Sequence, residues 1–354
     1  MGVLNILNKY LLNIALGLTG CVALSGCYTD FTPDIDARPV LCLNSLITAG
    51  EKISVDVTRS WVYTDVNGEK NHQVNDAVVN IFANGVRVED DYLPEEGDKI
   101  RIHAFSPTYG EAEATVKVPV APILKDIECV PTLKEGRVHE YEYTFCTTID
   151  FDLGIRVTLE DSPERQNYYH YGLDNYAEFV IRSDSPKGEL SVEESSCIIR
   201  DGILQYEVEP IFSEHISEFD AMMGGDVYGF TFFTDRQFSG SDYRLNLQYR
   251  NVQAIITCTP DNIEEVCDAG FIVCLSSVSE SYYNWFNYCW QIYSGAIGDL
   301  SEVGLAEPVK GYSNVSTGAG VVAARSTAKA RIPLDDFFVP LVRKALDKLS
   351  GNKE

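Results

Sequence analysis

The chain has 354 residues, with 53 acidic and 28 basic side chains, so its formal net charge is −25. A surface of this charge repels phosphate backbones, which excludes nucleic acid as a partner, and it gains no electrostatic attraction to anionic lipids. The hydrophobic fraction of 45% is enough for a packed core, and the length predicts two domains.

The N-terminal segment has the anatomy of a secretion signal. Its apolar stretch at residues 10–18 is too short and too interrupted to span a bilayer. It leads into Leu24-Ser25-Gly26-Cys27, the pattern of a bacterial lipobox, in which cleavage falls before a cysteine that carries lipid. We therefore predict a lipoprotein signal peptide over residues 1–26, with palmitate-type acylation of Cys27. An ordinary signal peptide that releases a soluble protein is the alternative.

A second cysteine competes for the lipid. Leu18-Thr19-Gly20-Cys21 also fits the lipobox pattern, so Cys21 is the alternative attachment site. Cys27 is favoured because a polar tether, residues 27–38, begins there. Cleavage at Cys21 would instead leave the apolar segment Val22-Ala23-Leu24 in the mature chain, where it has no evident role. One acyl chain binds a membrane only marginally, but several anchor stably. An acylated Cys27 would therefore hold even this acidic chain at the bilayer.

Eight of the ten cysteines lie beyond the lipobox. An even number of cysteines in an exported chain predicts disulfides. Cys258 and Cys267 bracket a polar loop between two apolar strands and are the first candidate pair. Cys129 and Cys146 bracket another polar loop and are the second. A zinc site is disfavoured because no Cys-x-x-Cys pair occurs and the histidines are scattered. We expect no metal and no cofactor.

Residues 39–121 have the pattern of short strands with one buried face. In residues 112–118, for example, alanine and valine alternate with glutamate, threonine and lysine, and turn signals such as Asn84-Gly85 separate the strands. This pattern predicts an immunoglobulin-like antiparallel β-sandwich. Pro119 and Pro122 close it, because proline ends strand ladders and stiffens linkers.

Residues 122–335 are predicted to form a larger β-rich second domain. Clean alternation marks strands such as residues 151–159, and a last strand is expected over residues 319–324. Residues 279–290 differ, because Ser279 is a plausible N-cap and apolar residues follow it at helical spacing. A short helical tail is predicted over residues 336–354. The predicted fold class is all-β.

The short aromatic helix is the first candidate for ligand contact. Aromatic faces stack on sugar rings and other flat apolar groups, and their polar tips orient them. The candidate residues are Tyr282, Tyr283, Trp285 and Trp290. The favoured alternative for these rings is packing of the helix against a sheet.

No catalytic motif stands out in the sequence. Asp150 and Asp152 share a strand face opposite Phe151, which is typical of solvated side chains and not of the converging carboxylates of glycoside hydrolysis. No Gly-x-Ser-x-Gly nucleophile elbow occurs. The acidic hairpin at residues 89–98 lacks the spaced aspartates of a calcium loop, so we interpret it as solvated. The sequence therefore predicts a protein that is not an enzyme.

An ordered set of motifs extends along nearly the whole chain beyond the tether. The motifs are Leu41 to Thr48, Val74 to Val79, Asp161 with Asn167-Tyr168-Tyr169, Phe233 to Gly240, Ser277 to Tyr283, and Ala306 to Val309 with Tyr312 to Val315, Gly318, Gly320 and Val321. This set resembles domain-of-unknown-function family 4249, lipoproteins of the Bacteroidota outer membrane. Members tend to be encoded beside TonB-dependent transporters, so the resemblance implies an accessory or substrate-capturing role there.

The lipobox, the acidic composition and the family resemblance together predict a non-catalytic lipoprotein that is anchored in the outer membrane through Cys27. We expect it to act as an accessory or substrate-binding subunit of TonB-dependent nutrient uptake. Its expected partners are the bilayer, the transporter and a small-molecule, glycan or peptide ligand. A structural or adhesive cell-surface protein and a hydrolase on an unfamiliar β scaffold are the alternatives. Its orientation, to the cell surface or the periplasm, stays open, because Asp30 alone is a weak signal for surface export.

Overall fold

The computed structural model describes residues 38–61, 70, 72–140, 145–161, 166–178, 196–200, 203–205, 209–213, 231–258, 268–293, 304, 310–341 and 344. The predicted signal peptide, most of the tether, and both lipidation candidates, Cys21 and Cys27, lie outside these residues. Residues 39–354 form one compact unit, separate from residues 1–38, so both predicted β domains belong to the same unit. No helix in the described part of the chain is long and apolar enough to cross a membrane.

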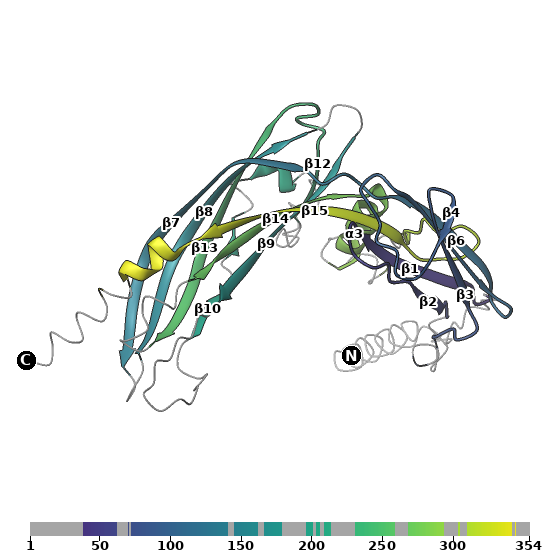
Figure 1. Ribbon diagram of the computed structural model, residues 1–354, viewed down its shortest axis with the longest axis horizontal. Helices are drawn as coiled ribbons and strands as arrows, with labels where there is room; N and C mark the ends of the chain where they lie inside the picture. The colour runs from purple at the N-terminus through teal and green to yellow at the C-terminus, as the bar shows by residue number, and fades with distance from the viewer. Residues whose placement is uncertain are drawn as a thin grey trace, which may run out of the picture. The chain divides into compact units, whose positions relative to one another are not determined.

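Within the described residues, the strands form three sheets, which confirms the all-β prediction (Figure 1). The largest sheet has the order β12 (Phe232–Thr234), β9 (Tyr168–Glu178), β14 (Asp268–Val278), β15 (Val322–Pro333), β1 (Leu41–Thr48) and β2 (Asp56–Arg59). The second comprises β10 (Ser196–Arg200), β13 (Tyr243–Cys258), β8 (Phe145–Glu160) and β7 (Ile123–Glu140), with β11 (Ile203–Leu204) paired to β13. The third has the order β4 (Val86–Val88), β3 (Val78–Ala83), β5 (Lys99–Ser106) and β6 (Gly110–Lys117).

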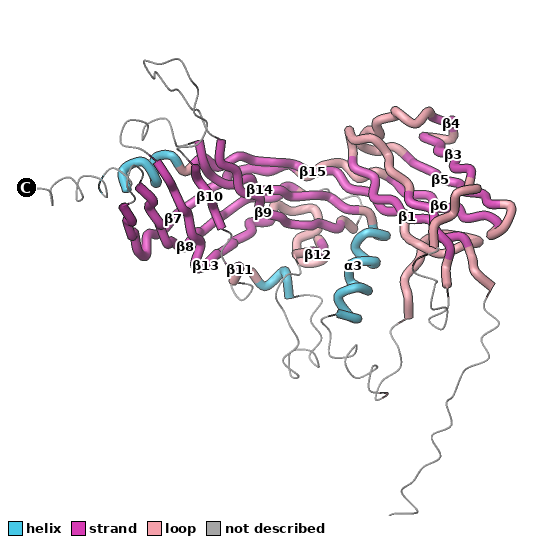
Figure 2. The backbone as a smooth tube through the Cα atoms, turned by 90° about the horizontal axis from the view of Figure 1, so that it is seen from below, coloured by secondary structure: helices cyan, strands magenta, loops and turns pink. Residues whose placement is uncertain are grey.

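The core of residues 39–121 is completed by the last strand of the described chain. Alternate residues of β5 and β6 are buried, as the sequence pattern predicted, and they face a core that also contains Leu41 and Leu43 of β1. The same core includes Val322 and Ala324 of β15, which pairs in parallel with β1 (Figure 2). Residues 39–121 therefore depend on a strand that lies about two hundred residues later in the sequence.

Two glycines allow the chain to approach β1 closely just before β15. Gly320 has a φ of 114°, and a Cβ there would lie 2.2 Å from the carbonyl oxygen of Leu43. A Cβ at Gly318 would lie 2.4 Å from the carbonyl oxygen of Leu41. Only glycine leaves room for the backbone hydrogen bonds that Ala319 exchanges with β1. The strand expected over residues 319–324 begins at Val322 and continues to Pro333 as β15.

A second core lies between β9 and β14 on one side and β8 and β13 on the other. The alternation predicted for residues 151–159 is confirmed, and Phe151 is completely buried. The Tyr249 hydroxyl of β13 donates a hydrogen bond of 2.9 Å to the Tyr171 hydroxyl of β9, which joins the two layers. The predicted helical tail begins one residue earlier than expected, with residues 335–341 helical and Phe338 packed on Phe151.

The proposed disulfide between Cys129 and Cys146 is wrong. The two residues do not bracket a loop, because they lie on neighbouring long strands, where Cys129 pairs with Ile155 and Cys146 with His139. Ile155 and Cys146 lie nine positions apart on β8, roughly 30 Å at the rise of a strand, whereas a disulfide needs Cα atoms within about 7 Å.

The four described cysteines whose side chains are placed are free thiols: Cys42, Cys129, Cys274 and Cys289. Cys129 packs partly buried against the second core, and burial raises its pKa to about 11. For the other proposed pair, Cys258 ends β13, and Cys267 lies outside the described residues.

Candidate functional site

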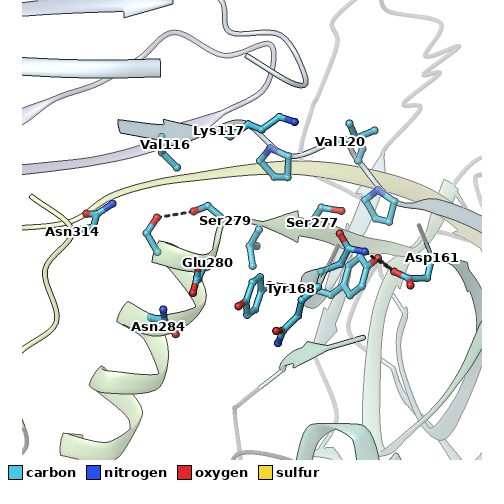
Figure 3. A pocket seen from close by; sticks show the side chains of 18 of the residues that line it. Val116, Lys117, Val120, Asp161, Tyr168, Ser277, Ser279, Glu280, Asn284 and Asn314 are labelled. Carbon is cyan, nitrogen blue, oxygen red and sulfur yellow. Dashed lines mark hydrogen bonds between the residues drawn. The ribbon is translucent and has the colours of Figure 1, made fainter. Parts of the chain in front are cut away.

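A cavity of about 1030 Å³ lies where β6, β8 and β14 end and where β9 and the aromatic helix begin (Figure 3). The connection from β6 to β7, residues 118–122, forms one wall, and the segment that leads into β15 forms another. Its lining combines hydroxyl, amide, carboxylate and aromatic groups, including Thr115, Asp161, Asn167, Tyr168, Ser277, Glu280, Asn284, Tyr312 and Asn314.

The connection from β6 to β7 is fixed by hydrogen bonds on both sides. The Val118 backbone N–H donates to the carbonyl oxygen of Asp98 at 2.8 Å. The Ser326 hydroxyl of β15 donates to the Pro119 carbonyl at 2.6 Å, and the Ala121 N–H donates to a carboxylate oxygen of Glu96 at 3.1 Å. This wall of the cavity is therefore held in place both by the connection from β4 to β5 and by β15.

The helix α3 (Glu280–Tyr293) is positioned by the N-cap that the sequence predicted. The Ser279 hydroxyl accepts hydrogen bonds from the backbone N–H groups of Tyr282, at 3.3 Å, and of Ala324 in β15, at 3.0 Å. The Ser281 hydroxyl donates to the Val322 carbonyl at 2.9 Å. These bonds attach the first turn of α3 to β15. Glu280 and Asn284 project from successive turns toward Tyr168 (Figure 3).

Three of the four candidate aromatics pack against the sheet and do not face the cavity. Tyr282, Tyr283 and Trp290 are partly buried in a cluster with Phe232 and Val278. Trp285 is 38% exposed, and its ring stacks on Tyr282 at 6.2 Å. The cavity is lined instead by other residues of the first two turns of α3, Glu280, Ser281 and Asn284. Sequence spacing could not distinguish these faces, because aromatic residues occur all round the helix.

Two buried carboxylates fix the start of β9. Asp161 accepts hydrogen bonds from the Tyr169 hydroxyl at 2.6 Å, the Asn167 side-chain amide at 2.9 Å and the Gly240 N–H at 2.7 Å. Asp235 accepts from the Asn167 backbone N–H at 2.9 Å. Burial raises the pKa of Asp235, and the nearby charge of Asp161 raises it further. This network joins motifs that lie about seventy residues apart, and it holds Tyr168 at the cavity wall.

The carboxylates that line the cavity already have partners. Glu160 forms an ion pair with Lys125, and Asp161 accepts the three hydrogen bonds above. Burial raises the pKa of Tyr168, and the charge of Glu280 and a hydrogen bond to its carboxylate raise it further. Acid–base hydrolysis needs two carboxylates that converge on one substrate bond. Glu160 and Asp161 instead face partners within the fold, Lys125 for Glu160 and Tyr169, Asn167 and Gly240 for Asp161.

The predicted polar and acidic groups elsewhere have structural partners. Asp150 and Asp152 lie on the outer face of β8, as expected, where they contact Gln253 at 2.9 Å and Lys134 at 2.8 Å. In the acidic hairpin, Asp98 accepts a hydrogen bond from the Asn84 side chain at 2.7 Å and so stabilises the turn. Among the described residues, no group of three or more histidine, cysteine or acidic side chains is arranged to hold a metal ion.

Sequence reasoning did not identify the segment before β15 as part of a site. The side-chain amide of Asn314 makes two hydrogen bonds to the backbone of Val322. Its NH2 group donates to the Val322 carbonyl oxygen at 2.8 Å, and its oxygen accepts from the Val322 N–H at 2.9 Å. The Ser313 hydroxyl donates to the Gly320 carbonyl at 2.8 Å. Asn314 and Ser313 therefore tie the segment to its own turn. The motif around Tyr312 to Val315 was the signal that could have found it.

Of the motifs that carried the sequence resemblance, Asp161 with Asn167-Tyr168-Tyr169 and Ser277 to Tyr283 contribute to the cavity lining, and Leu41 to Thr48 forms β1 at the junction with β15. Val74 to Val79 leads into β3, and Ala306 to Val309 lies outside the described residues. A family model described as a domain of unknown function, DUF4249, matches residues 28–331 of the chain. No curated protein and no solved structure shows significant similarity to it. Since the match covers most of the chain, the protein belongs to the DUF4249 family.

Proposed function

We propose that this protein is a non-catalytic, lipid-anchored binding subunit that serves a TonB-dependent transporter at the outer membrane. The observation that carries the proposal is the cavity at the start of α3. Its volume of about 1030 Å³ is at the upper end of the range for small-ligand sites, and its walls are fixed by hydrogen bonds before any ligand arrives. A site that is already formed binds without the cost of ordering its own side chains.

The anchor in this proposal is Cys27. The lipobox ends at this residue, and the family match begins directly after it, at residue 28. The compact unit begins at Pro39, so residues 27–38 supply a short tether between lipid and fold. A multiply acylated cysteine holds a protein at a membrane regardless of its surface charge, which suits a chain with a net charge of −25.

Co-purification from native membranes tests this proposal. The full-length chain, tagged at its C-terminus, is extracted in mild detergent and its partners are identified by mass spectrometry. We expect a TonB-dependent transporter with the unchanged chain and its loss with Cys27→Ala, while Cys21→Ala behaves like the unchanged chain. Repeated absence of any such transporter would contradict the accessory role, and loss of membrane attachment with Cys21→Ala alone would move the anchor to Cys21.

A further inference from the structure

The edge of β6 opens into the cavity. β6 is the last strand of the third sheet, with β5 as its neighbour on one side. On the other side, Glu113 exchanges two backbone hydrogen bonds with Ser316, one of 3.1 Å and one of 2.8 Å. Beyond Glu113 this ladder stops, and Thr115 and Lys117 line the cavity.

The backbone groups of Thr115 and Lys117 point away from β5. Val118 exchanges its backbone hydrogen bonds with the β5 side, through Asp98 and Gly97. Because backbone polar groups alternate sides along a strand, those of residues 113, 115 and 117 point to the opposite side. At Glu113 they meet Ser316; at Thr115 and Lys117, both exposed, no backbone partner occurs in the described chain.

The missing partner is explained by the segment that leads into β15. If the pairing of Ser316 with Glu113 continued in register, Asn314 would lie opposite Thr115 and Tyr312 opposite Lys117. Instead, the Asn314 amide bonds to Val322, and Tyr312 bonds to Asn284 of α3. The segment therefore leaves β6, and the cavity occupies the space of the missing strand.

We infer that this cavity binds an extended peptide, which adds as a strand to the open edge of β6 at Thr115 and Lys117. Main-chain hydrogen bonds supply affinity when a peptide extends a sheet, and side-chain pockets supply selectivity. The inference rests on the proposed binding function and names its ligand class.

The charges around the cavity select against acidic peptides. Glu160, Asp161 and Glu280 line it, and Lys117 is the one cationic residue among the described residues of the lining. The Lys117 amine is directed away from Tyr168 and Glu280 (Figure 3). An acidic side chain would enter next to carboxylates without a cation to pair with, which is unfavourable. The Tyr168 ring and the amide of Asn284 offer contacts to uncharged side chains.

One substitution removes an outward N–H without touching the β5 ladder. Proline lacks the N–H, and a sheet tolerates it on an edge strand when that N–H faces outward. We expect Thr115→Pro to weaken peptide binding by about tenfold, the loss of roughly one hydrogen bond plus a poorer fit. The matched variant, Thr115→Ala, loses only the side-chain hydroxyl and keeps the N–H, so it should weaken binding several-fold less than Thr115→Pro. Circular dichroism and thermal unfolding show whether both variants fold.

The probe is a pool of synthetic heptapeptides without aspartate or glutamate, captured on the full-length protein and identified by mass spectrometry. The tightest peptide is then resynthesised with N-methyl groups on its odd or on its even residues. A paired strand uses N–H groups of one set only, so one methylated series should lose binding and the other should keep it. This peptide test does not depend on the folding of any variant.

Equal binding by Thr115→Pro and Thr115→Ala, or equal effects of the two methylated series, would overturn the inference. Capture of no peptide, with binding of neutral hexasaccharides instead, would also overturn it but would leave the proposed accessory function intact. Peptide binding without any co-purifying transporter would support the peptide site and contradict the accessory role.

Discussion

At the scale of single residues, most motif positions near the cavity hold the backbone in place. Asn167 joins Asp161 to Asp235, Ser279 joins α3 to β15, and Asn314 closes the turn before β15. Each is a small polar side chain that satisfies backbone or carboxylate groups away from water, where an unmade hydrogen bond is expensive. The types of these residues could be recognised in the sequence, but their partners lie up to about seventy residues away and could not.

His170 should make stability depend on pH. It stacks on Phe232 at 4.2 Å, and burial, assisted by Arg325, lowers its pKa from 6.5 to about 4. At pH values between 4 and 6.5, His170 is protonated in the unfolded chain but not in the folded chain. The free energy of unfolding therefore falls as the pH drops from 6.5 to 4. The full loss is about 3 kcal/mol at most.

Urea unfolding at a series of pH values measures this effect. We expect His170→Phe, which keeps the ring contact and removes the titrating group, to flatten the curve between pH 6.5 and 4. The control His103→Phe, on the solvent side of β5, should keep the slope of the unchanged chain. A His170→Phe curve as steep as that of the unchanged chain would show that another group is responsible.

At the scale of elements, strands with one buried face could be predicted, and the exposed strand β7 could not. β6 and β8 could be recognised because apolar and polar residues alternate along them, and one face of each strand packs on a core. β7 was missed because it is an exposed edge strand, interrupted by Pro131 and by two irregularities in its pairing with β8. Prediction of the Cys129–Cys146 disulfide failed for the same reason, since it took this strand for a loop.

The junction of β1 with β15 predicts a strong effect at Gly320. Alanine there would place its Cβ 2.2 Å from the Leu43 carbonyl oxygen at a φ of 114°, so the two strands would have to separate. We expect Gly320→Ala to destabilise the fold by more than about 2 kcal/mol. Gly136→Ala in β7, where a Cβ meets nothing within 4 Å, should change stability by less than about 1 kcal/mol. Thermal unfolding compares the two, and equal effects would refute the close approach.

At the scale of the whole molecule, the first and last described strands are neighbours. This parallel pairing of β1 with β15 encloses the N-terminal core and brings the segment around Asn314 beside β6. No local pattern in the sequence could predict it, because the partner of each strand is set by packing and not by the strand's own residues. The open edge at Thr115 follows from the same long-range arrangement, so the alternation of residues 112–118 indicated a strand but not a binding site.

The central claim is that the cavity beside β6 captures nutrient for uptake. Its most direct test is competitive growth, on a panel of peptide and carbohydrate nutrients, of strains that encode Thr115→Pro, Thr115→Ala or no copy of the protein. We predict that on at least one peptide nutrient the Thr115→Pro strain falls behind to the same extent as the deletion strain, while the Thr115→Ala strain, which keeps the N–H, falls behind less. A deletion strain that falls behind on a nutrient while Thr115→Pro competes like the parent would contradict the claim.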